Sequence, residues 1–172
     1  MSGTQRILGI DPGSRITGFG IIDTKSSRST YVSSGCVRTE TSQMMTRMRE
    51  IFDALGQLIE QYRPQEIAIE RVFVHRNADS ALKLGQARAA ALCASFSLEL
   101  PVFEYSPREI KLAVVGTGAA DKVQVQHMVK MLLQLAGNVQ ADAADALAVA
   151  LCRAGQRTTN RMLGTVAGAG GQ

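Results

Sequence analysis

The sequence has no apolar run approaching the roughly 18 residues that a membrane span requires. Its first residues, "MSGTQR", also lack the apolar stretch of a signal peptide. Both absences argue against a membrane-bound or secreted protein. We therefore expect a soluble, cytoplasmic protein that has no membrane partner.

Cysteine and histidine are also scarce. The three cysteines are far apart and form no CxxC pair, so the sequence predicts neither a disulfide framework nor a zinc site. The two histidines, His75 and His127, are interpreted as surface or packing residues. No Ser-His or Cys-His arrangement for nucleophilic catalysis is evident. Any hydrolytic chemistry therefore needs another source of nucleophile.

The composition is that of an ordinary globular protein with a basic excess. Of 172 residues, 45% are hydrophobic and 20% charged, and the net charge is +4. The length suits one domain, which we place at residues 1–154. Residues 155–172 have no apolar period and finish in the glycine-rich stretch "GTVAGAGGQ", so we expect a flexible C-terminal tail. The basic balance favours an acidic partner such as nucleic acid.

The order of predicted elements indicates an α/β fold. Three short segments rich in β-branched residues and separated by turn residues predict an antiparallel meander. Helices and strands then alternate, which adds strands by parallel crossovers. The result is a mixed five-stranded sheet with helices on both faces. The predicted strands are 7–11, 17–23, 29–37, 66–70 and 101–106, and the predicted helices are 44–62, 78–98, 107–114, 121–135 and 141–154.

Four acids are expected at one end of this sheet. Asp11 ends the first predicted strand, "ILGID", and Glu70 ends the fourth, "EIAIE". If these strands are parallel neighbours, both carboxylates lie at the same edge, where ligands of such sheets bind. Asp142 and Asp145 are three residues apart, on one face of an Ala-rich helix that can approach the sheet closely.

Each acid also has a simpler interpretation. Asp142 could favour the helix dipole, Glu70 could be a solvated strand end, and Asp11 could accept hydrogen bonds from the turn that follows it. Four acids together are harder to explain in this way. Two unit charges about 5 Å apart repel by about 3 kcal/mol at an effective dielectric of about 20.

A cation would relieve this repulsion. Oxygen ligands without nearby His or Cys favour Mg²⁺, or Mn²⁺ in its place. Two such ions about 3.5–4 Å apart can activate water and clamp the attacking and leaving oxygens of a phosphodiester. The sequence therefore predicts a nuclease site with two metal ions.

The remaining charges fit a nucleic-acid partner. Without the four acids, 19 Lys and Arg face 11 acidic residues, a balance of +8. Phe73 follows Glu70 in a predicted loop that also contains Arg76, and an aromatic among cations can stack on an unpaired base. The segment "GTGAADKVQ" precedes a helix beginning near Lys122, and it is either a plain turn or a phosphate contact.

Four stretches together resemble one family: "LGIDPGSRITGFG", "AIERVFVHRNADSALKLGQAR", "VFEYSPREIK" and "ADAADALAVA". They are similar to the RuvC family of crossover junction endodeoxyribonucleases, the Holliday junction resolvases. The resemblance implies an RNase H-like fold, a homodimer and Mg²⁺-dependent paired nicking of four-way junction DNA that leaves 5′-phosphate and 3′-hydroxyl ends. It also implies a branch-migration motor of the RuvA and RuvB type as partner.

The resemblance further assigns roles to residues that match the family motifs. Asp11, Glu70, Asp142 and Asp145 fall on the catalytic, metal-binding acids. Phe73 matches the aromatic that stacks into the opened junction, while Lys111 and Lys122 match basic residues near the scissile phosphate. Arg76, in the same predicted loop as Phe73, is a further candidate DNA contact.

Two other classes of protein share part of this pattern. An actin-like ATPase or sugar kinase has a phosphate loop similar to "DPGS", but it needs two such domains, for which 172 residues leave no room. A non-catalytic junction-binding module would not require all four acids. The small residues of helix 78–98, such as Gly85 and Ala89, either contribute to a dimer contact or pack on their own sheet.

Overall fold

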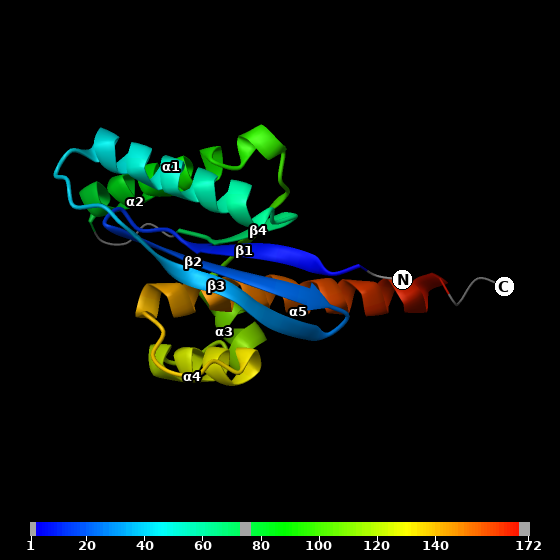
Figure 1. Ribbon diagram of the computed structural model, residues 1–172. Helices are drawn as coiled ribbons and strands as arrows, with labels where there is room; N and C mark the ends of the chain where they lie inside the picture. Colours follow the sequence, from blue (N-terminus) through cyan, green and yellow to red (C-terminus); the bar gives the residue numbers. More distant parts are fainter. Residues whose placement is uncertain (1–2, 73–76, 169–172) are drawn as a thin grey trace.

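The computed structural model describes residues 3–72 and 77–168, and within these ranges five strands form one sheet in the order β3-β2-β1-β4-β5. Helices α1 and α2 cover one face, and α3, α4 and α5 lie on the other (Figure 1). The strands are β1 (Gln5–Asp11), β2 (Ile16–Lys25), β3 (Arg28–Arg38), β4 (Glu66–Glu70) and β5 (Val102–Tyr105). The helices are α1 (Met44–Tyr62), α2 (Ala78–Cys93), the 3₁₀ turn η1 (Phe96–Leu98), α3 (Pro107–Val115), α4 (Lys122–Leu133) and α5 (Ala141–Gly168).

The strand pairing confirms the predicted mixed sheet. β1 pairs antiparallel with β2, and β2 pairs antiparallel with β3. β4 pairs parallel with β1 on one side and with β5 on the other. The carboxyl ends of β1 and β4 therefore meet at the same edge of the sheet, as the prediction for Asp11 and Glu70 required.

Helix α1 shows how the sequence pattern produces this layer. Ile51, Leu55 and Ile59 recur every four residues and are buried against the sheet. The helix stops at Arg63, which adopts the left-handed conformation (φ 49°) directly before Pro64. The chain then enters β4, whose core residues are buried because helices cover both faces of the sheet.

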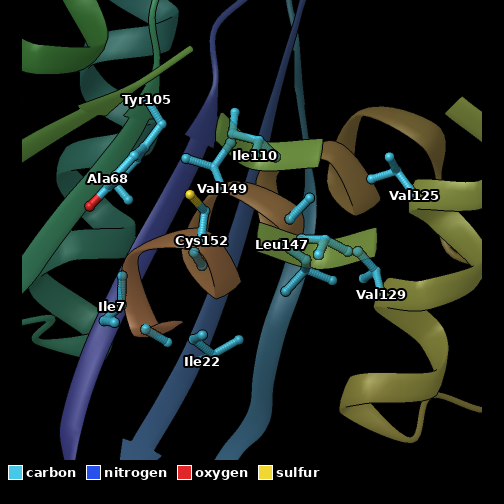
Figure 2. Packing of buried hydrophobic residues seen from close by; sticks show 14 of the residues in the cluster. Ile7, Ile22, Ala68, Tyr105, Ile110, Val125, Val129, Leu147, Val149 and Cys152 are labelled. Atoms are coloured by element: carbon cyan, nitrogen blue, oxygen red, sulfur yellow. The ribbon is translucent and has the colours of Figure 1, made fainter. Parts of the chain in front are cut away.

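Helix α5 lies unusually close to the sheet. A Cβ placed on Gly9 of β1 would lie 2.1 Å from the carbonyl oxygen of Ala146, and one on Gly18 of β2 would lie 2.0 Å from that of Asp142. The glycines thus make room for the helix backbone itself. Figure 2 shows the core around this contact, in which Leu147 of α5 lies between the sheet and Val129 of α4.

Two helices end far from the residue that the pattern predicts. The expected helix 78–98 ends at Cys93, and a 3₁₀ turn follows it. The expected helix 141–154 continues to Gly168. This continuation has tertiary contacts that its sequence does not reveal, since Arg157 donates to Glu66 and Thr158 donates to the carbonyl of Ser26. That residues 155–172 form a flexible C-terminal tail stays a prediction.

Membrane insertion is not supported by any helix in the described part of the chain. Within residues 3–72 and 77–168, no helix combines the length and the apolar character that crossing a bilayer would need.

Candidate active site

Three elements bring the four predicted acids to one edge of the sheet. Asp11 is the last residue of β1, and Glu70 is the last residue of β4. Asp142 and Asp145 lie in the first turns of α5. The register explains how they meet, because Gly18 pairs with Asp11 and also lies against the backbone of Asp142. The expected juxtaposition of the four acids is thus present.

The acids influence one another electrostatically. Burial raises the pKa of Asp11 to about 7, and the nearby carboxylates of Glu70, Asp145 and Asp142 add to the increase. Burial also raises the pKa of Glu70, with a further contribution from Asp145. Both effects disfavour the charged forms. The site is therefore short of positive charge.

Two lysines partly compensate this charge. Lys122, at the start of α4, forms an ion pair of 2.7 Å with Asp145, and this hydrogen bond raises the pKa of the lysine. Lys111 of α3 acts on Glu70 from the same side and opposes the increase in its pKa. A phosphate drawn towards these ammonium groups would therefore approach the carboxylates.

Two hollows meet at the acids. One, of about 210 Å³, is lined by Glu70, Asp145, Lys111 and Lys122 together with apolar residues of α3 and α4. The other, of about 140 Å³, is lined by Asp11 and Glu70 among others. Glu70 borders both hollows, which together we call the depression. Three of the four acids line it, and Lys111 and Lys122 line the hollow that contains Glu70 and Asp145.

The donor chemistry of this depression fits Mg²⁺, because all four candidate ligands are hard carboxylate oxygens. Within the described residues, however, no three His, Cys, Asp or Glu side chains are grouped closely enough to hold a metal ion as they stand. The ion pair of Lys122 with Asp145 and the repulsion among the acids both oppose a closer approach of the carboxylates. A bound cation would reduce this repulsion.

Two of the predicted DNA contacts are in the segment that follows β4. Phe73 and Arg76 lie outside the residues that the structure describes, so their roles stay predictions. Sequence reasoning did not identify Gly9 and Gly18 as residues that set the position of the acids. A signal was available, because glycines in strands opposite an Ala-rich helix are typical of close helix approach.

We expect the metal-free protein to lose stability as the pH rises from about 4 to about 7. The folded state keeps a proton on Asp11 up to a pKa of about 7, whereas an unfolded Asp releases it near about 3.9. Between these values the folded state binds more protons, so unfolding becomes easier as the pH increases. Urea unfolding in EDTA at pH 5.5 and 7.5 measures the effect.

An Asp11→Asn variant is the control for this experiment, since it cannot titrate at that position. Its loss of stability between the two pH values should be smaller than that of the wild type by about 1–2 kcal/mol. Equal losses in the two proteins would contradict the raised pKa of Asp11.

The sheet order and the acids at its edge define the class of the protein. A three-stranded meander followed by two parallel strands, with acids at the ends of β1 and β4 and at the start of α5, is an RNase H-like nuclease arrangement. The comparisons with known proteins then identify the family within the class.

The family model for "Crossover junction endodeoxyribonuclease RuvC" matches residues 7–153. The RuvC of Methylococcus capsulatus is 55% identical over 154 residues, which cover 90% of this chain and 93% of that protein. The chain therefore belongs to the RuvC family of crossover junction endodeoxyribonucleases, which are hydrolases. Family membership implies that a metal is required for activity.

Solved structures agree with this assignment. Thermus thermophilus RuvC in complex with a Holliday junction substrate superposes with a TM-score of 0.85 and 31% identity, covering 91% of this chain and 96% of that one. The yeast mitochondrial Holliday junction resolvase has a TM-score of 0.63 at 14% identity, with 91% of this chain and 82% of that one covered. This second likeness shows a shared fold alone.

Proposed function

We propose that this protein resolves four-way DNA junctions in recombination and repair by paired, symmetric hydrolysis of phosphodiester bonds, leaving 5′-phosphate and 3′-hydroxyl ends. The observation that carries the proposal is the meeting of Asp11, Glu70, Asp142 and Asp145 at one edge beside two lysines. The Thermus thermophilus relative, which was solved with a Holliday junction substrate, supports the choice of DNA.

Each side chain has a distinct task in the proposed mechanism. The four carboxylates would hold two Mg²⁺ ions, for which Mn²⁺ would substitute, and these ions would supply an activated water and neutralise charge at the scissile phosphate. Lys122 and Lys111 line the depression beside Glu70 and orient the phosphate. Phe73 and Arg76 follow β4 in sequence and act on the opened junction, where the Phe73 ring stacks on a base.

The test is cleavage of an end-labelled synthetic four-way junction beside a linear duplex of matched sequence, with Mg²⁺. Symmetric nicks confined to the junction support a resolvase. Binding without nicks across several core sequences would instead favour a non-catalytic junction-binding module. Linear duplex cut as fast as the junction would contradict structure specificity.

We further propose that the protein acts as a homodimer through the outer side of α2. Leu82 is 64% exposed, and Gly85, Ala89 and Cys93 are exposed along the same helix. The inner side of α2 packs on its own sheet through Ala87, Ala90 and Ala91. In this proposal the outer side of α2 forms the dimer contact, and its inner side packs within its own subunit.

Leu82→Glu is expected to shift the protein from dimer to monomer by placing a charge in this contact. Sedimentation velocity measures the change. On a junction, the variant should nick single strands instead of cutting two strands in symmetric pairs. Leu132→Glu on α4, where Leu132 is 47% exposed, is the matched control and should leave the dimer intact. A dimeric Leu82→Glu protein would exclude α2 as the interface.

The proposed cellular setting follows from the family. Residues 1–154 form the nuclease domain in this proposal, and the segment after residue 154 takes no part in the chemistry. The protein acts in the cytoplasm on junctions presented by a branch-migration motor of the RuvA and RuvB type.

A further inference from the structure

A buried ion pair joins α5 to the sheet at the end opposite the acids. Arg153 Nε donates to Glu66 Oε2 at 2.7 Å, and their side chains are 10% and 8% exposed. Arg157 donates to the other oxygen of Glu66. The Arg153 guanidinium also lies 3.3 Å from the centre of the Phe103 ring on β5. One side of α5 is therefore held by directional contacts to the first residue of β4 and to β5.

The spacing relates this pair to the active site. Glu66 and Glu70 begin and end β4, so they are separated by about 13 Å along the strand. Asp145 and Arg153 are eight residues apart on α5, or about 12 Å along the helix. Helix α5 runs antiparallel to β4 (Figure 1). Arg153 therefore contacts Glu66 at one end of the strand, and Asp145 lies near Glu70 at the other end.

The glycines between these two ends set how closely α5 approaches the sheet. Gly9 and Gly18 face the helix backbone at Ala146 and Asp142. The glycines themselves offer no side chain that would hold the helix at one position along its axis. A charged, hydrogen-bonded pair has a narrow distance range and resists sliding.

We propose that the Glu66–Arg153 pair sets the axial position of α5 against β4 and thereby the separation of Asp145 from Glu70. Both residues are positioning residues, since they lie at the far end of the sheet and contact no reacting atom. The proposal rests on the function proposed above. It predicts that loss of the pair weakens metal binding and slows cleavage without weakening junction binding.

The test replaces the pair with apolar residues in the double variant Glu66→Leu, Arg153→Met. Buried ion pairs replaced in this way often leave a folded protein of similar stability, so sliding of α5 can be examined separately from unfolding. We expect Mn²⁺ affinity, measured by calorimetry on the full chain, to fall at least about threefold. The single-turnover cleavage rate should fall about tenfold, with the dissociation constant for the junction within about twofold.

Two single variants separate positioning from stability. Arg153→Lys keeps the charge and should retain most of the Mn²⁺ affinity. Asp23→Asn breaks the ion pair of Arg6 with Asp23 between β1 and β2, which is 2.8 Å long and does not involve α5. It should lower the melting temperature without changing Mn²⁺ affinity. Should the double variant fail to fold, Glu66→Gln replaces it, because it removes the charge to which both Arg153 and Arg157 of α5 are paired and keeps the size of the side chain.

Unchanged Mn²⁺ affinity in the folded variant that lacks the pair would overturn the proposal. An equal loss of affinity in Asp23→Asn would also overturn it, because the effect would then reflect stability alone. Failure of the proposed function is recognised separately, as absence of junction cleavage by the wild type. The Mn²⁺ measurement does not depend on that cleavage.

Discussion

Asp11→Asn is expected to abolish junction cleavage, with a loss of at least about 1,000-fold, while junction binding is retained. Asparagine keeps the size of the side chain but removes the charge that a metal ion requires. The change lies at the end of β1 and leaves the lysines and the basic surface unaltered. Single-turnover cleavage of an end-labelled junction and a gel-shift titration measure the two properties.

A stability measurement on the same variant shows whether the loss of cleavage is caused by unfolding. Since Asp11 is held among like charges, its neutralisation should make the metal-free protein more stable at pH 7.5. Glu70→Gln and Asp142→Asn should lose cleavage in the same way. Asp121→Asn is the matched control, because Asp121 caps α4 beside the site and asparagine caps a helix equally well. Cleavage at the wild-type rate by Asp11→Asn would refute the assignment.

Gly18→Ala is expected to destabilise the protein by about 2–3 kcal/mol and to slow cleavage about 100-fold. The new Cβ would lie 2.0 Å from the carbonyl oxygen of Asp142, and a backbone atom cannot rotate away as a side chain can. Helix α5 must therefore move outward at its first turn, and Asp142 and Asp145 move with it. Urea unfolding and single-turnover cleavage measure the two effects.

Gly56→Ala is the matched control for this substitution. Gly56 lies within α1, and a Cβ placed there has no atom within 4 Å. Alanine in a helix is more favourable than glycine by about 0.5–1 kcal/mol, so this variant should gain a little stability and keep its cleavage rate. A Gly18→Ala protein that behaves like Gly56→Ala would show that the close approach of α5 is not needed.

The sequence predicted the architecture well where a local pattern reports on burial. The β-branched segments separated by turn residues, the four-residue spacing of Ile51, Leu55 and Ile59, and the apolar "EIAIE" strand each match the structure. Helix ends were predicted less well. Beyond residue 154, helix α5 contacts Glu66 through Arg157, which lies 91 residues away in the sequence, and no local pattern reports such a contact.

The sequence by itself determined the kinds of groups at the candidate site and the edge to which they belong. Asp11 and Glu70 end strands that the order of elements makes parallel, and Asp142 and Asp145 share one side of a helix. Only the tertiary structure decided how near the acids come to one another. That distance depends on Gly18 beneath Asp142, on Lys122 beside Asp145 and on burial, which raises the pKa of Asp11 to about 7. Packing and desolvation are properties of the assembled layers, so they arise only when the helix and the sheet meet.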